Sequence, residues 1–245
     1  MQRFFVAPDS AAIKENEIIL RDEEQLHQMM RVLRMEVGDR VVCLDNTGME
    51  YDCVVQELGK KNAVLKVEGK VIAKTEPTVN VTIYQALPKK MELFEWVLQK
   101  GTELGVKKFV PMITAFCQRN ELPKRERLER ILVEAAEQSE RGIIPLLANA
   151  VEYKKAIAED TAALKIVLHS RGTWPLLSTL MAEHKDATEV ALFIGPEGGL
   201  RDDEVSLAEK SGAHIASLGP RILRTETAAI AAAALVLIPC AAHGA

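Results

Sequence analysis

The sequence predicts an α/β protein in which a small β-barrel precedes a larger domain built on a parallel sheet. Up to about residue 72, short strand-like segments dominate, separated by turn signals such as Gly38-Asp39. After Pro77, apolar strand segments alternate with helical ones, the pattern of a parallel sheet with helices on both faces. Lys74 to Thr78 is the expected linker, which gives domains of residues 1–72 and 77–245.

Composition excludes several classes of protein. The 245 residues are 48% hydrophobic and 27% charged, with a net charge of −4, as in an ordinary globular chain. No apolar run approaches the roughly 18 residues of a membrane helix, and the N-terminus lacks a signal-peptide core. The cysteines and histidines show no metal-ligand spacing. We therefore expect a cytoplasmic protein with no metal and no membrane partner.

The N-terminal domain is expected to be mostly β-structure with one helix, at residues 23–33. In this helix His27, Arg31 and Arg34 follow i, i+4, i+7 spacing and share one face. Such a stripe could present guanidinium groups to phosphates, although a histidine there could equally serve packing. The expected strands are Arg3–Ala7, Glu17–Leu20, Arg40–Asp45, Tyr51–Glu57 and Ala63–Val67.

The C-terminal domain is expected to alternate between strands and helices. The strands are Val79–Leu87, Phe109–Ile113, a short one near Ile144, Leu164–Leu168, Val190–Ile194 and His214–Leu218. The helices are Met91–Leu104, Pro123–Ser139, one near Tyr153, Trp174–His184, Asp202–Ser211 and Thr225–Ile238. The last helix is apolar nearly all round and rich in alanine, which predicts burial and close approach of another backbone.

Two loops carry the strongest functional signal, residues 195–199 (GPEGG) and residues 218–228 (LGPRILRTETA). Each follows a strand, where α/β proteins bind their ligands. Neither has the spacing of a phosphate-binding loop, and the helix that opens at residues 202–204 begins with three carboxylates that would repel a pyrophosphate. The pocket is therefore expected to take a neutral or cationic ligand, and S-adenosylmethionine, with its sulfonium and ammonium groups, fits.

Charged residues also stand at the entry to the buried last helix. Arg221, Arg224 and Glu226 need partners or a task there, because buried charge is costly. An Arg224–Glu226 ion pair or a helix cap at Thr225 is the purely structural alternative.

Several motifs along the chain resemble one family. They are His27-x3-Arg31-Val32-Leu33-Arg34, Gln85 to Lys89, Gln99 to Val106, Glu134 to Ser139, Ile194 to Leu200 and Leu218 to Ala228. Together they resemble the bacterial 16S ribosomal RNA uridine-N3 methyltransferases of the SPOUT superfamily. The resemblance implies a PUA-like RNA-binding barrel and a methyltransferase domain with a C-terminal trefoil knot. It also implies a homodimer that acts on 16S rRNA or the small ribosomal subunit, with S-adenosylmethionine as cofactor.

The resemblance, together with the chemistry of a uracil nitrogen that carries a proton, gives expected roles for individual residues. Arg224 would stabilise charge on the uracil, and Glu226, with Glu197 as a second candidate, would take or direct the proton. Cofactor contacts are expected at Leu168, His169, Gly195, Pro196, Glu197, Gly198, Gly199, Leu218, Gly219, Ile222, Leu223 and Thr227, and RNA contacts at Arg3, Arg31, Arg34 and Lys89. The alternatives are a related methyltransferase acting on another rRNA position or a ribose 2′-hydroxyl, and a non-catalytic ribosome-binding protein.

Overall fold

The computed structural model describes residues 1–6, 11–14 and 16–241, which form two compact units. The first unit is Met1–Glu76 together with Ala136–Ile144, and the second is Pro77–Ala135 together with Pro145–Ala245. The first unit therefore contains a segment that the expected boundaries assign to the C-terminal domain. Ala7, the expected end of the first strand, lies outside the described residues.

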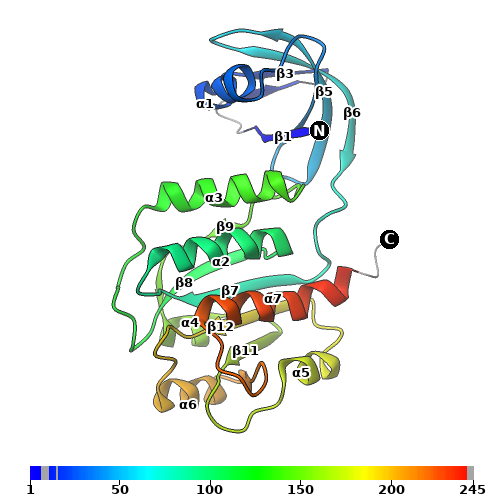
Figure 1. The fold of residues 1–245 in the computed structure, drawn as a ribbon. Coiled ribbons are helices and arrows are strands. Elements are labelled where there is room, and N and C mark those ends of the chain that lie inside the picture. Colours follow the sequence, from blue (N-terminus) through cyan, green and yellow to red (C-terminus); the bar gives the residue numbers. More distant parts are fainter. Residues whose placement is uncertain (7–10, 15, 242–245) are drawn as a thin grey trace. The chain divides into compact units, whose positions relative to one another are not determined.

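The first unit is a curled six-stranded sheet (Figure 1). Its order is β1-β4-β5-β6-β3-β2, so β1 and β2 are the two edges, and no pairing joins them within the described residues. The small PUA-like barrel expected is thus confirmed in the form of a curled half-barrel, and β2 was not anticipated. Its strands are β1 (Gln2–Phe5), β2 (Ala11–Ile13), β3 (Glu17–Leu20), β4 (Arg40–Leu44), β5 (Met49–Leu58) and β6 (Ala63–Ile72).

The expected helix of the first unit changes character halfway along. Helix α1 (Glu23–His27) is capped by Asp22, whose carboxylate accepts a 2.8 Å hydrogen bond from the Gln25 N–H. The chain then continues as a π-helix, η1 (Gln28–Val32). Because a π-helix bonds residue i to i+5, the α-helical spacing that grouped the basic stripe ends at His27.

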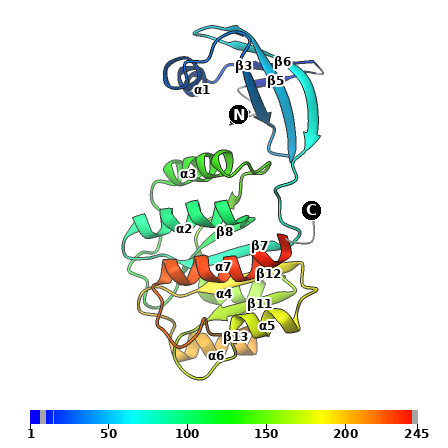
Figure 2. The same cartoon turned by 45° about the vertical axis from the view of Figure 1, so that its right-hand side comes forward.

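The second unit is built on seven parallel strands (Figure 2). Their order is β10-β8-β7-β12-β11-β13, and β9 pairs with β8. Since all are parallel, their carboxyl ends meet at one edge, where the loops that follow them gather. The strands are β7 (Asn80–Ala86), β8 (Lys108–Ile113), β9 (Leu146–Leu147), β10 (Val151–Glu152), β11 (Leu164–Leu168), β12 (Glu189–Ile194) and β13 (His214–Ala216).

Helices follow most of these strands, as the alternating pattern predicts. They are α2 (Met91–Leu104), α3 (Arg125–Gln138), α4 (Tyr153–Glu159), α5 (Leu177–Glu183), α6 (Asp202–Lys210) and α7 (Thr225–Ala241). The sheet residues Tyr84 and Phe193 share a core with Tyr153 of α4 and Val205 of α6. Helix α7 packs against β7, β12 and α2. The short strand expected near Ile144 corresponds to β9, and β10 was not anticipated.

Helix α7 is buried on one face only, which differs from the expected all-round burial. Ala229, Ala232, Ala233, Val236 and Leu237 are buried, whereas Leu235 is 41% and Ile238 60% exposed. Packing among the residues that the structure describes therefore does not explain the apolar composition of the second face. None of the described helices is long and apolar enough to cross a membrane.

Candidate active site

A cleft of about 900 Å³ opens in the second unit at the carboxyl edge of its sheet. The loops after β7, β8, β11, β12 and β13 line it, together with the start of α7. The parallel topology explains this assembly, because it brings loops that are far apart in sequence to one edge.

Most of the residues expected to bind the cofactor or act in catalysis lie around this cleft. Thr227 does not line it; its side chain is exposed on α7. Lys89, expected to contact RNA, does line it. The expected residues that line the cleft are Lys89, Leu168, His169, Gly195, Pro196, Glu197, Gly198, Gly199, Leu218, Gly219, Ile222, Leu223, Arg224 and Glu226.

Two glycines turn bare backbone toward the open cleft. Gly199 and Gly219 have φ of +76° and +109°, backbone conformations that residues with a side chain rarely adopt. A Cβ added to either would meet nothing within 4 Å. Gly198 differs, because its Cβ would lie 3.1 Å from the Cβ of Phe116. A ligand could therefore approach the backbone of each loop closely, at Gly199 in one and at Gly219 in the other.

A buried hydrogen-bond chain joins the two loops to the end of β7. The Thr225 hydroxyl donates to the carbonyl oxygen of Gly195 at 2.6 Å and accepts from Nε2 of Gln85 at 2.8 Å. Thr225 is 6% and Gln85 1% exposed. The Oε1 atom of Gln85 is buried and has no hydrogen-bond partner among the described residues. Thr225 therefore ties helix α7 to the 195–199 loop, a role that the sequence suggested only as a helix cap.

The carboxylates near the cleft have different tasks. Asp202 lines the cleft, but Asp203 pairs with Arg201 at 2.7 Å. Glu204 is 4% exposed and accepts a hydrogen bond from the Ala115 N–H at 2.9 Å. Glu197 accepts one from the Lys89 N–H at 3.0 Å. Only one of the three carboxylates that open α6 therefore lines the cleft.

Several cations at the cleft are free of carboxylate partners. Lys89, Arg171, Arg221 and Arg224 line the cleft, and none forms an ion pair with any residue that the structure describes. The Arg224–Glu226 ion pair that was the structural alternative is therefore absent among the described residues. These side chains remain available to an anionic ligand.

His169, which lines the cleft, has a lowered pKa. Burial lowers its pKa from the ordinary value of 6.5; the charge of Arg171 acts in the same direction, and Asp202 opposes it. Its backbone N–H donates to the Ala216 carbonyl at 3.0 Å, and its ring meets Trp174 edge to face. Its environment thus favours the neutral imidazole.

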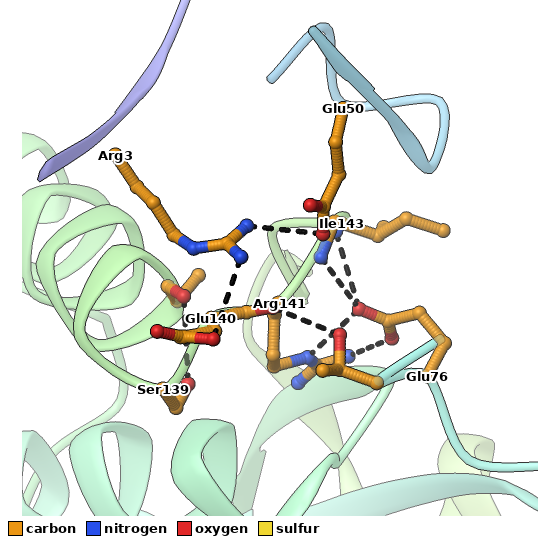
Figure 3. A network of polar contacts seen from close by, with 10 residues as sticks. Arg3, Glu50, Glu76, Ser139, Glu140, Arg141 and Ile143 are labelled. Carbon is orange, nitrogen blue, oxygen red and sulfur yellow. Dashed lines mark hydrogen bonds and ion pairs between the residues drawn. The ribbon is translucent and has the colours of Figure 1, made fainter. Parts of the chain in front are cut away.

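The remaining expected RNA contacts lie in the first unit and differ in availability. The guanidinium of Arg3 lies 3.0 Å from Glu50 and 3.4 Å from Glu140, with 15% of its side chain exposed (Figure 3). Arg31 and Arg34 are exposed, and Arg34 has a φ of +53° just beyond η1. Arg3 is therefore committed to ion pairs, whereas the other two arginines face solvent.

The same network holds the segment that returns to the first unit. Arg141, 3% exposed, contacts the Glu76 carboxylate at 2.7 Å (Figure 3). The backbone N–H groups of Gly142 and Ile143 each donate to Glu76 at 3.2 Å. One carboxylate just before Pro77 thus anchors residues 141–143.

Sequence reasoning missed some of the residues that shape the cleft. Gln85 belongs to a motif that was noticed but given no role, and Phe116 was not singled out. An aromatic residue in a polar loop after a predicted strand was the available signal for Phe116, which is 51% exposed.

Comparisons with known proteins agree over nearly the whole chain. An RNA methyltransferase domain matches residues 74–237, and an RNA methyltransferase PUA domain matches residues 20–68. The Ribosomal RNA small subunit methyltransferase E of Bacillus subtilis is 31% identical over 238 residues, covering 93% of each chain. That of Synechocystis is 36% identical over 96% of this chain and 76% of its own. The structure of the Neisseria gonorrhoeae protein of the same name, bound to S-adenosyl methionine, superposes with a TM-score of 0.84 at 25% identity, covering 96% of this chain and 95% of that one.

Proposed function

This chain belongs to the RNA methyltransferase family that contains the Ribosomal RNA small subunit methyltransferases E, and we propose that it methylates ring nitrogen 3 of one uridine in 16S ribosomal RNA, with S-adenosylmethionine as donor. The observation that carries this proposal is the cleft at the carboxyl edge of the parallel sheet, with the Gly199 and Gly219 backbones open to it. A ribosomal RNA substrate would place the protein in the cytoplasm.

The cleft residues fit the cofactor chemically. The open space at Gly199 and Gly219 suits the close approach of a flat ligand to backbone. Asp202 and Glu197 provide negative charge for a ligand that carries a sulfonium and an ammonium group. We propose that the 195–199 loop lines the ribose and methionine side, and that backbone groups at Leu218, Gly219, Ile222 and Leu223 hold the adenine. When bound, S-adenosylmethionine supplies an activated methyl group.

The protein must make the uracil nitrogen nucleophilic, because that nitrogen carries a proton. We propose that Glu226 accepts this proton and that the guanidinium of Arg224 stabilises the negative charge left on the uracil oxygens. Both residues line the cleft at the start of α7, and Arg224 has no carboxylate partner among the residues described. Holding the base next to the cofactor supplies the alignment of the reacting atoms.

RNA contacts would come from local basic residues rather than from net charge. Arg31 and Arg34 of the first unit are exposed, and Lys89 lines the cleft of the second. Changing Arg31 and Arg34 to Ala should weaken binding to the small ribosomal subunit. It should also reduce the salt dependence of that binding by up to about two phosphate equivalents. An unchanged salt slope would remove these arginines from the RNA interface.

The exposed face of α7 supports a homodimer. Leu235 and Ile238 are exposed there beside the half-buried Ala231 and Ala234, so an apolar stripe remains uncovered in one subunit. Ala233 is buried within the subunit, so a charge there would test folding rather than assembly. Leu235→Glu should yield a monomer in sedimentation at micromolar concentration; a wild-type monomer would refute the dimer.

The decisive experiment is methyl transfer onto small subunits from a strain that lacks the modification, followed by mass mapping of the RNA. A single N3-methylated uridine is the expected product. A methyl group on another base position or on a ribose would assign the chain to a related specificity. Tight subunit binding without transfer would support a non-catalytic ribosome-binding protein.

A further inference from the structure

A smaller hollow opens beside the cofactor cleft in the second unit. It measures about 290 Å³ and is lined by Lys89, Phe116, Gln118, Glu197 and Gly198. All of these except Gln118 also line the cleft, so the two spaces adjoin. Sites for drug-sized ligands measure roughly 300–1,000 Å³, so the side hollow suits one small planar group next to the cofactor.

The rim of the hollow is held by contacts between three loops. The Lys89 N–H donates to the Glu197 carboxylate at 3.0 Å, and the Lys89 carbonyl accepts from the Arg119 guanidinium at 3.4 Å. These residues follow β7, β12 and β8 respectively. These contacts join the three loops around the hollow, while the Lys89 ammonium remains free of carboxylate partners in the described chain.

Phe116 is held at this hollow by the turn that carries it. The Cys117 N–H donates to the Thr114 carbonyl at 3.1 Å, and the Ala115 N–H donates to the buried Glu204 at 2.9 Å. Phe116 nevertheless remains 51% exposed. Gly198 provides the necessary clearance, since a Cβ there would lie 3.1 Å from Phe116. The turn thus presents an aromatic ring to the hollow and to the edge of the cofactor cleft, where the ring is half exposed and does not belong to the core.

We propose that this hollow receives the uracil base that is methylated, stacked on Phe116, and this inference rests on the proposed function. Ring nitrogen 3 is used in base pairing, so the target base must leave its helix to react. Unpaired bases are commonly held by stacking on aromatic side chains. Gln118, which forms no hydrogen bond in the described structure, offers an amide to a uracil carbonyl. Lys89 and Arg119 supply positive charge for the flanking phosphates.

The test compares Phe116→Ala with Phe116→Tyr, which keeps an aromatic face. Leu146→Ala is the matched control, because Leu146 is similarly exposed (59%) but lies on β9 away from the cleft. Binding of unmodified small subunits is measured in the presence of S-adenosylhomocysteine, kcat and KM by methyl transfer, and S-adenosylmethionine affinity by calorimetry. Phe116→Ala should weaken subunit binding and raise KM by about 5- to 100-fold. Phe116→Tyr should restore most of the binding, Leu146→Ala should resemble wild type, and in every variant cofactor affinity should change much less than binding of the small ribosomal subunit.

Each other outcome has a definite meaning. Unchanged subunit binding and KM in Phe116→Ala, with an active wild type, would overturn the base site and leave the proposed function standing. Loss of cofactor affinity with normal subunit binding would assign the hollow to the cofactor instead. A wild type that binds subunits without methylating them would overturn the proposed function and, with it, the assignment of a methylated base to the hollow.

Discussion

The hydroxyl of Thr225 donates a 2.6 Å hydrogen bond to the carbonyl oxygen of Gly195, joining the first turn of α7 to the loop after β12. These residues are 30 positions apart in the sequence. Gly195 and Thr225 both line the cleft, and the hydrogen bond between them couples the position of the loop after β12 to the start of α7. The sequence suggested only a helix-capping role for Thr225, whereas in the structure its hydroxyl also bonds the Gly195 carbonyl.

Thr225→Val should weaken both stability and cofactor binding. Valine keeps the shape of the side chain but leaves the Gly195 carbonyl and the Gln85 amide without their shared partner, which costs about 1–3 kcal/mol. Thr225→Ser restores the hydroxyl and is the control. Urea unfolding and calorimetry with S-adenosylmethionine provide the two readouts, and equal behaviour of the valine and serine variants would show that the bond has no such role.

Gly199→Ala should lose cofactor affinity, whereas Gly212→Ala should not. The two glycines have nearly equal φ, +76° and +74°, and a Cβ at either would meet nothing within 4 Å. Both substitutions should therefore cost a similar 1–2 kcal/mol or so of unfolding free energy from backbone strain. Only Gly199 lines the cleft, so only there should the new methyl group obstruct a ligand. Similar cofactor affinities in the two variants would argue against ligand contact at Gly199.

His169 should make the stability of the protein depend on pH below about 6.5. Burial lowers the pKa of His169 in the folded chain below its ordinary value of 6.5. The unfolded chain then binds a proton at higher pH than the folded chain, so protonation favours unfolding. The unfolding free energy should fall as the pH decreases through 6.5 toward the folded pKa. This component should be absent in His169→Gln and retained in His184→Gln, as measured by urea unfolding across that range.

Glu76→Ala should destabilise the first unit by about 3–5 kcal/mol, because Arg141 is 3% exposed and loses the carboxylate beside it. The N–H groups of Gly142 and Ile143 lose their acceptor as well. Asp203→Ala removes the carboxylate of an exposed pair with Arg201 and should cost less than about 1 kcal/mol. Comparable losses in the two variants would show that the Glu76 contacts add little.

Arg224→Ala should reduce single-turnover methyl transfer by roughly 100-fold or more, as loss of a group that stabilises developing charge does. Arg224→Lys should recover only part of the rate, since lysine lacks the guanidinium fork. If Glu226 accepts the proton, Glu226→Gln should be similarly slow and should regain rate as the pH rises. Full activity in Arg224→Ala, with cofactor and subunit binding intact, would leave Arg221 as the next candidate.

The sequence by itself determined the fold class and the edge of the sheet that carries the cleft. Alternating strand and helix segments imply a parallel sheet, and the loops at residues 195–199 and 218–228 follow strands of that sheet. Helix α2 and strand β11 have the bounds that their apolar patterns predict. Local periodicity and strand-end position were sufficient here because they depend only on neighbours in the chain.

Tertiary structure decided everything that depends on partners distant in sequence. It paired Arg141 with Glu76, which brings residues 136–144 into the first unit, and it committed Arg3 to ion pairs. It changed the pitch of the basic helix after His27 and left one face of α7 exposed. It also brought Phe116 beside Gly198. The type of a residue and its spacing in the sequence do not specify which distant group compensates its charge, or whether an aromatic ring is covered. Both depend on how the whole chain packs.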